Sequence, residues 1–375
     1  MKILAIHTGY HEDQNKRSAV DAWRIKRPLR ELRKHTDWEI TERQSLIPSV
    51  GRMKSAKEFT ASELENAFRE ISQYDIVFSA YQSNPSLWTL LRVAQERAGT
   101  QYVMDVDDNM FAINPDNPVW TNITDENVYM MQRMIANNAW LTTTNEHLAN
   151  IFRERRPDMP ENTVKVIPNY IPDDYKEYDP DNGDKIAIGF FGGSTHYGDL
   201  HRTGVLEAVR KLMHEHKNVY FKSIGMIVDT YLPRARVIIG DAKRGDPWIN
   251  EIFPAMNLDI ALGPLEDNIF NHAKSDIKWQ EATRAGAAFV CSDIGPYSAL
   301  PDATAIKVEN QTDQWYNALK RLIQDAEARQ TYVKNSRAKL QTQHRLETHW
   351  QAYKTTFETV YKAKVQQKNP SLVLS

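Results

Sequence analysis

The sequence predicts an α/β protein with two doubly wound domains in tandem. Short apolar runs alternate with amphipathic segments of about ten or more residues, the pattern of parallel strands joined by helices. This alternation stops at an acidic stretch that contains prolines, and then restarts. The length of 375 residues also exceeds what one small core requires.

The first half of the chain predicts six strands and five helices. Strands are expected where β-branched, aromatic and other apolar residues cluster, at residues 2–8, 38–41, 75–80, 100–108, 140–145 and 164–171. Helices are expected between them, at 21–35, 62–72, 86–99, 126–139 and 146–156. Pro28 falls in the first of these helices, where it should occupy the first turn or kink the helix.

The second half repeats the pattern after residues 172–184, PDDYKEYDPDNGD, which indicate an interdomain linker. Strands are expected at 185–191, 219–226, 236–240, 258–265, 287–293 and 304–309. Helices are expected at 199–214, 247–257, 275–286 and 312–326, followed by a charged helical tail over 326–366. The predicted division is an N-terminal domain over 1–172, a linker over 173–184, a C-terminal domain over 185–345 and a terminal segment over 346–375.

Composition narrows the class of protein. The formal net charge of -2 gives no global attraction to nucleic acid or an acidic membrane. The single cysteine, Cys291, cannot build a disulfide framework, and we interpret it as a small buried residue. We expect neither a signal peptide nor a membrane helix, and therefore a cytoplasmic protein.

The stretch IGFFGGSTHYGDL, residues 188–200, ends a predicted buried strand just before a helix. Glycines at this point let a ligand approach the backbone. The candidate contacts are Gly192, Gly193, Ser194, Thr195 and His196. A tight turn in which Asp199 caps the helix is the structural alternative, and both interpretations can hold together.

A second cluster combines cations with a carboxylate. Lys278 and Glu281 share a helix face, and Lys274 joins it if the helix starts early; if Ser275 is the N-cap, Lys274 lies just outside. A diphosphate needs cations and N–H donors near a helix N-terminus, and a ribose needs a carboxylate. The structural alternative is a solvated helix face with one ion pair.

Three aspartates, Asp105, Asp107 and Asp108, end a predicted strand of the first domain. One hypothesis is an acceptor-hydroxyl site with a carboxylate as hydrogen-bond partner or base. A magnesium site is a second hypothesis, since three carboxylates suit this ion, and loop caps with salt bridges are the structural alternative. His7 and Arg24 are further candidates for acceptor contacts.

Residues 24–34, RIKRPLRELRK, place six basic side chains in eleven positions. They indicate either a solvated helix face or a local track for a polyanion such as DNA.

The stretch DIALGPLEDNIFNHAKSDIKWQEATRAGAAFVCSDIGPY resembles the nucleotide-sugar half of GT-B glycosyltransferases in the glycosyltransferase family 4-like group. One branch, which includes phage-encoded members, carries the motif FNxxKSxxKxxE, which is matched by Phe270, Asn271, Lys274, Ser275, Lys278 and Glu281. FFGGSTHYGDL and YVMDVDDNMF resemble two further segments of this branch. The implied fold has two Rossmann-like domains that face a central cleft, with the segment 346–375 returning to the N-terminal domain as a helix with a loose tail.

The resemblance also implies roles. Glu281 would hold the ribose, and Gly193 and Ser194, within the turn Gly192–Thr195, would present N–H groups to the diphosphate or the sugar. Lys278, alone or with Lys274, would balance the leaving phosphate charge. Asn271 completes the expected donor contacts, and the residues expected to act in catalysis are Lys278, Glu281, Asp107 and His196.

Two departures from the family pattern stand out. Ala273 occupies the place of the first of two glutamates eight residues apart, and Thr195, His196 and Tyr197 replace the usual arginine and lysine after the turn. The positive charge would then come from Lys274, Lys278 or His196.

The resulting prediction is a glycosyltransferase that uses a nucleotide sugar, with a UDP-sugar favoured, and no bound cofactor or divalent metal. Transfer with retention is expected from the resemblance. The acceptor is either a glycan or lipid-linked sugar, or a hydroxymethylated base in phage DNA. The alternative is a non-catalytic nucleotide-sugar or nucleic-acid binding protein on the same fold.

Overall fold

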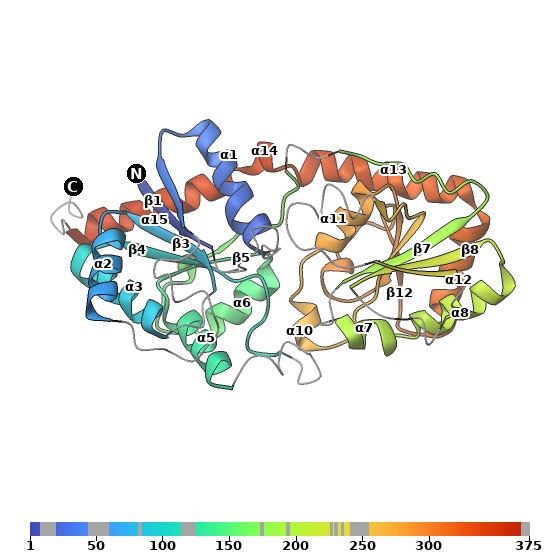
Figure 1. The fold of residues 1–375 in the computed structure, drawn as a ribbon, viewed down its shortest axis with the longest axis horizontal. Helices are drawn as coiled ribbons and strands as arrows, with labels where there is room; N and C mark the ends of the chain where they lie inside the picture. The colour runs from blue at the N-terminus through green and yellow to red at the C-terminus, as the bar shows by residue number, and fades with distance from the viewer. Residues whose placement is uncertain are drawn as a thin grey trace. The chain divides into compact units, whose positions relative to one another are not determined.

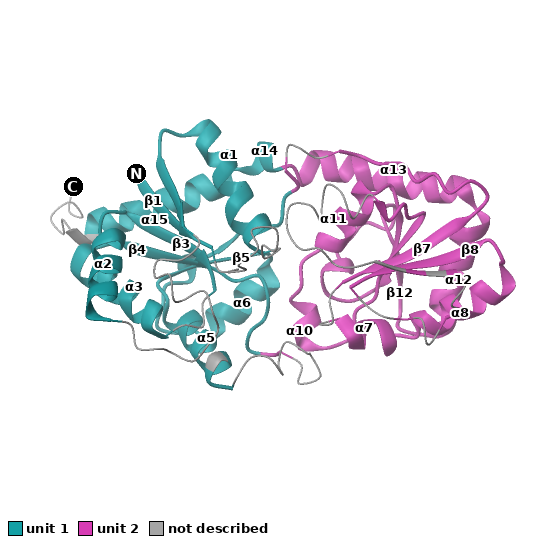
Figure 2. Ribbon diagram, in the orientation of Figure 1, with its two compact units in different colours: residues 1–111, 123–170, 346–375 teal, residues 112–122, 171–345 magenta. Residues whose placement is uncertain are grey.

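The computed structural model describes residues 1–7, 20–43, 60–81, 85–113, 125–172, 176–192, 196–225, 228, 232–233, 236–240 and 255–368. They belong to two compact units (Figure 2). Unit 1 takes its residues from 1–111, 123–170 and 346–375, and unit 2 takes its residues from 112–122 and 171–345.

Unit 1 contains a six-stranded parallel sheet with the order β2-β1-β3-β4-β5-β6 (Figure 1). Its strands are β1 (Lys2–Ile6), β2 (Glu39–Arg43), β3 (Ile76–Ala80), β4 (Gln101–Asp105), β5 (Trp140–Thr143) and β6 (Val164–Val166). β3 and β4 are buried along their whole length, as expected for strands covered on both faces.

The helices of unit 1 fall where amphipathic patterns predict them: η1 (Asp21–Lys26), α1 (Arg27–His35), α2 (Ala61–Ile71), α3 (Pro85–Ala98), α5 (Asp125–Asn137) and α6 (Glu146–Glu154). Pro28 is the second residue of α1, which continues directly from the π-helical segment η1. A proline cannot donate a helical N–H hydrogen bond, which is consistent with the departure from regular α-helical geometry just before it. A capping box between Thr60 and Glu63 starts α2.

The C-terminal segment belongs to unit 1. After α14 (Leu346–His349), α15 (Gln351–Lys368) places Tyr353, Phe357 and Val360 in the same core as the strands β1, β3 and β4. The ring of Phe357 meets that of Phe78 edge to face, with centroids 5.1 Å apart. The first unit is therefore completed by the last helix of the chain (Figure 2).

Unit 2 contains a second six-stranded parallel sheet, with the order β12-β11-β10-β7-β8-β9. Its strands are β7 (Ile186–Phe191), β8 (Val219–Ile224), β9 (Val237–Gly240), β10 (Ile260–Gly263), β11 (Ala288–Ser292) and β12 (Ile306–Val308). Each predicted strand of the chain thus has an observed counterpart. The two parallel sheets with their helices confirm the predicted fold class of two Rossmann-like domains.

The helices of unit 2 are α7 (Tyr197–His201), α8 (Val205–Glu215), α10 (Ile269–His272), α11 (Ile277–Arg284), α12 (Thr312–Gln324) and α13 (Ala326–Gln343). The single helix predicted over 199–214 is wrong. The helix is interrupted before Gly204, which has a φ of 82° and packs so closely that an added Cβ would lie 2.9 Å from the Thr312 nitrogen. The helix predicted over 247–257 lies almost entirely outside the described residues.

Candidate functional site

The topology of unit 2 indicates where a ligand binds. β7 lies between β8, which follows it in the chain, and β10, which comes later, so the strand order reverses there. In open α/β sheets, ligands bind beyond the carboxyl ends of the strands at such a reversal. The segments that follow β7 and β10 carry the glycine-rich turn and the FNxxKSxxKxxE motif.

Asp199 joins these two segments. One carboxylate oxygen, Oδ2, accepts a hydrogen bond from Nδ1 of His196 at 2.7 Å. The other, Oδ1, accepts from Nδ2 of Asn271 at 2.6 Å and from the backbone nitrogen of Glu266 at 2.9 Å. The Asp199 side chain is almost fully buried, and burial alone would raise its pKa. The hydrogen bonds from His196 and from the Glu266 backbone help to hold the pKa below its usual value.

The role expected for Asp199 as a helix cap is wrong. α7 begins at Tyr197, so Asp199 lies inside the helix, and its carboxylate holds α10 and the residues after β10 instead. The sequence signal for this role is the spacing of His196 and Asp199, which are three residues apart and therefore neighbours on a helical turn.

Lys278 lies at the second position of α11, with its side chain 8% exposed. Its ammonium donates a hydrogen bond to the carbonyl of Phe191, the last residue of β7. The same nitrogen lies 5.1 Å from the ring centroid of Phe190 and 4.8 Å from that of Phe191. Burial lowers the pKa of Lys278 to about 8, against the opposing effect of Glu281.

Lys274 and Glu281 are the other two charged residues of the motif, and they lie before α11 and within it, respectively. α11 begins at Ile277 with Asp276 as its N-cap residue, so Ser275 is not the cap and Lys274 lies outside the helix. The Lys274 ammonium lies 4.6 Å from the ring centroid of Phe270. Glu281 is half-buried on α11, where its charge favours the ammonium form of Lys278.

His196 cannot supply the positive charge that its position suggested. Burial and the charges of Lys278 and Lys274 lower its pKa to about 3, against the opposing effect of Asp199. The imidazole is therefore neutral at neutral pH, and the cations of this site are Lys274 and Lys278.

Gly192 provides space between these groups. A Cβ at this position would lie 2.9 Å from Cδ2 of His196 and 3.1 Å from Nζ of Lys278. The next three residues of the turn, Gly193, Ser194 and Thr195, lie outside the described residues.

In unit 1, Arg24 and Asp105 form a buried pair, with Nε 3.0 Å from Oδ1 and Nη2 2.9 Å from Oδ2. Their side chains are 1% and 0% exposed. Thr142 also donates to the Asp105 carboxylate at 2.6 Å. Contacts with an acceptor were predicted for both residues, but their charged groups are engaged with each other inside the unit.

Asp107 and Asp108 lie beyond the carboxyl end of β4 and are both half-buried. Burial and the charges of Asp108 and Asp105 raise the pKa of Asp107 to about 8. Its Oδ1 atom has no hydrogen-bond partner among the described residues. Among the predicted acceptor-site residues, Asp107 is the one with such an unsatisfied buried oxygen in the described part of the chain.

His7 follows β1 and is engaged with the adjacent strand. Its Nε2 atom lies 2.8 Å from Oε2 of Glu42. The other oxygen of this carboxylate, Oε1, accepts a hydrogen bond from Arg33. The contact with His7, followed by that with Arg33, lowers the pKa of Glu42 to about 2 despite partial burial. This geometry favours a structural role for His7.

The basic segment 24–34 does not form a continuous exposed track. Arg24 and Arg27 are buried, and the guanidinium of Arg27 lies 4.7 Å from the ring centroid of Trp23. Lys34 pairs with Glu31 at 2.9 Å. Several of the basic side chains that suggested a polyanion track are thus buried or paired within unit 1.

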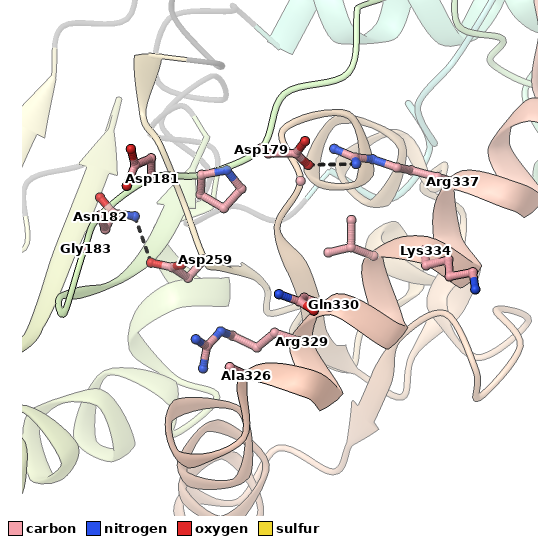
Figure 3. A pocket seen from close by; sticks show the side chains of 13 residues that line it. Asp179, Asp181, Asn182, Gly183, Asp259, Ala326, Arg329, Gln330, Lys334 and Arg337 are labelled. Atoms are coloured by element: carbon pink, nitrogen blue, oxygen red, sulfur yellow. Dashed lines mark hydrogen bonds and ion pairs between the residues drawn. The ribbon is translucent and has the colours of Figure 1, made fainter.

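A cavity of about 560 Å³ opens at the amino ends of the strands of the second sheet, opposite the carboxyl ends where the His196–Lys278 cluster lies (Figure 3). It lies between residues 179–183 and α13, near the residues that precede β10 and β11. Arg337 donates to Asp179 at 2.8 Å, and Asn182 donates to Asp259 at 2.8 Å. These pairs attach the segment before β7 to the rest of unit 2, at the amino ends of the strands and away from the His196–Lys278 cluster.

Within the described residues, no group of three or more histidine, cysteine, aspartate or glutamate side chains could hold a metal ion. No helix in this part of the chain is long and apolar enough to span a membrane.

Two Rossmann-like domains with this strand order define the GT-B fold, and comparison with known proteins supports the same class. No family model and no curated protein matches the sequence. The chain is similar in structure to HepE of Anabaena in complex with UDP and glucose, at 14% identity, with 96% of this chain and 100% of that chain covered and a TM-score of 0.63.

Two further solved structures are similar to this chain over almost its whole length. Sucrose-phosphate synthase of Thermosynechococcus elongatus is 11% identical, with 96% and 99% of the two chains covered and a TM-score of 0.63. A glycosyltransferase from Rickettsia africae is 12% identical, with 97% and 98% covered and a TM-score of 0.60. At these identities the similarities establish the fold.

Proposed function

We propose that this protein is a glycosyltransferase that moves a sugar from a nucleotide sugar, most favourably a UDP-sugar, to a hydroxyl acceptor. The observation that carries the proposal is the buried ammonium of Lys278 at the carboxyl end of β7, beside Gly192. A desolvated cation gains a partner when an anionic diphosphate arrives. UDP is chosen because structures of the similar HepE contain UDP and UDP-glucose.

The donor would lie at the carboxyl edge of the second sheet. Lys278 and Lys274 would neutralise the diphosphate, and the N–H groups of the turn Gly192–Thr195 would bind its oxygens. Glu281 would accept hydrogen bonds from the ribose hydroxyls, and Asn271 would maintain the wall of the site through its hydrogen bond to Asp199.

Charge neutralisation by lysines is compatible with transfer that needs no divalent metal. The charge that develops on the leaving phosphate is the same whether a lysine or a metal balances it. Retention of the anomeric configuration is part of the proposal and rests on the resemblance to family 4-like enzymes. NMR coupling constants of the product's anomeric proton test it directly.

Donor binding is the first test. Isothermal titration calorimetry with UDP should give saturable binding, and Lys278→Met should weaken it by about tenfold or more because a charged hydrogen bond is lost. Lys334→Met is the matched control, since Lys334 is an exposed lysine of the same unit, on α13 beside the cavity. Wild-type protein that binds none of UDP, GDP and ADP would refute the donor site.

Turnover with acceptors is the second test, and Asp107 is the proposed acceptor-hydroxyl contact. Glycans, lipid-linked sugars and hydroxymethylated DNA should be offered with the nucleotide sugar that binds. Transfer that is abolished in Asp107→Ala supports the enzyme and its acceptor site. Binding of the donor without transfer or hydrolysis would instead favour the non-catalytic nucleotide-sugar binding protein.

A further inference from the structure

The hydrogen bonds around Asp199 determine which nitrogen of His196 carries the proton. Asp199 Oδ1 accepts from the backbone nitrogen of Glu266 at 2.9 Å and from Nδ2 of Asn271 at 2.6 Å. The orientation of the Asn271 amide is fixed, because its Nδ2 atom also donates to the carbonyl of Glu266 at 3.0 Å. Asp199 thus acts as an ionised acceptor on this side.

The other oxygen of the same carboxylate therefore also accepts, and Nδ1 of His196 is the donor at 2.7 Å. A neutral imidazole carries one proton, so Nε2 presents a lone pair. Burial and the two nearby lysines lower the pKa of His196, which keeps the ring neutral. Among the described residues, no hydrogen bond to Nε2 is present.

The Cδ2–Nε2 edge of the His196 ring lies beside Gly192, the residue that follows β7. Cδ2 of His196, which is bonded to Nε2, would lie 2.9 Å from a Cβ at Gly192, and Nζ of Lys278 would lie 3.1 Å from the same point. The ring edge that carries Nε2 and the ammonium of Lys278 therefore lie near one position. An ionised phosphate oxygen suits the ammonium but is repelled by the lone pair, whereas a hydroxyl group can donate to the lone pair.

We propose that His196 accepts a hydrogen bond through Nε2 from a hydroxyl of the transferred sugar, and that Asp199 is the positioning residue that fixes the required tautomer. This inference rests on the proposed function, since the sugar would follow the diphosphate bound at Lys278. It assigns His196 to recognition of the sugar and leaves the diphosphate to the lysines.

The binding test compares UDP with UDP-glucose, UDP-galactose and UDP-N-acetylglucosamine by calorimetry, in wild type and in His196→Asn. Asparagine keeps a donor near the position of Nδ1 for Asp199 and lacks the Nε2 acceptor. The sugar nucleotide that binds tighter than UDP should lose about threefold to tenfold in affinity, the size of a neutral hydrogen bond, while UDP binding stays unchanged. Equal losses for both ligands, or no sugar that improves on UDP, would overturn the inference.

The tautomer test needs no ligand. Long-range proton–nitrogen NMR of protein labelled at histidine nitrogens should show His196, assigned by its absence in His196→Asn, as neutral with the proton on Nδ1 at pH 7. Asp199→Asn should move the proton to Nε2, because the amide group can donate to Nδ1. A wild-type ring that is charged or protonated on Nε2 would overturn the inference even if Asp199→Asn does not fold.

The two failures are distinguishable. Absence of UDP binding in the wild type removes the proposed function, and the sugar contact with it. Normal UDP binding together with the wrong tautomer removes only the assignment of His196 and Asp199.

Discussion

The guanidinium of Arg24 and the carboxylate of Asp105 form a two-point hydrogen-bonded pair in the core of unit 1, with N–O distances of 3.0 and 2.9 Å. Arg24 also donates to the carbonyl of Ile167 at 2.6 Å and to Asn169 at 3.2 Å. The arginine thereby joins η1 to the end of β4 and to the residues after β6. Burial opposes its charge, but the pairing with Asp105 raises the pKa of Arg24 above its usual value.

Removal of one member of this pair should destabilise unit 1. Arg24→Met leaves the Asp105 carboxylate buried without its cation, which should cost about 3–5 kcal/mol of unfolding free energy. Hydrogen exchange of the β3 and β4 amides reports this loss for unit 1 alone. The double variant Arg24→Met with Asp105→Leu should recover part of the loss, and a single variant that costs less than about 1 kcal/mol would contradict a structural role.

The last helix should contribute to the stability of the first unit. Phe357 is fully buried against Phe78, so Phe357→Ala should cost about 3–5 kcal/mol through lost burial and the cavity left behind. The same hydrogen-exchange measurement tests it, and Lys362→Ala on the exposed part of α15 is the control. Unchanged exchange in the β3 amides of Phe357→Ala would show that α15 does not support this core.

The sequence predicts central strands such as β3 and β4 well, because they are short apolar runs that a parallel sheet buries on both faces. The turn at Gly192 and the helix bearing Lys278 and Glu281 are also found from residue types, since their chemistry is local in the sequence. These positions need only a strand-to-helix turn and one helix face, which periodicity indicates.

The remaining features depend on tertiary contacts. Arg24 and Asp105 are 81 positions apart, and nothing in either segment indicates that the two charges are buried together. Asp199 has the sequence of a helix cap, but Asn271, 72 positions away, reaches its carboxylate. The neutrality of His196 follows from its burial and from two lysines, both of which only the fold brings about.

Gly192 should be required for space. Its backbone is not among the left-handed glycines, yet a Cβ would lie 2.9 Å from His196 and 3.1 Å from Lys278. Gly192→Ala should therefore displace these side chains and weaken UDP binding by about tenfold, the cost of one charged hydrogen bond. Gly183→Ala is the control, because Gly183 has a φ of 58° but open surroundings. This variant should lose about 1 kcal/mol of stability through backbone strain and keep normal UDP binding. Equal UDP affinity in both variants would contradict the packing around Gly192.

The buried ammonium of Lys278 should make donor binding and stability respond to pH in opposite directions. Its pKa in the folded protein is about 8, lowered from 10.5 by burial. Below about pH 8 the ammonium is present and would bind the diphosphate of the proposed donor, whereas the neutral amine above this pH would not. UDP affinity should thus fall by up to tenfold for each pH unit above 8, because the bound ligand stabilises the protonated form.

Over the same range the unfolded chain holds more protons at this position than the folded protein, so the unfolding free energy of the unliganded protein should rise. Both trends are measured as differences from Lys278→Met, which removes the titrating group and so isolates it from other lysines and tyrosines. Affinity that declines equally in wild type and Lys278→Met would assign the pH dependence to another group.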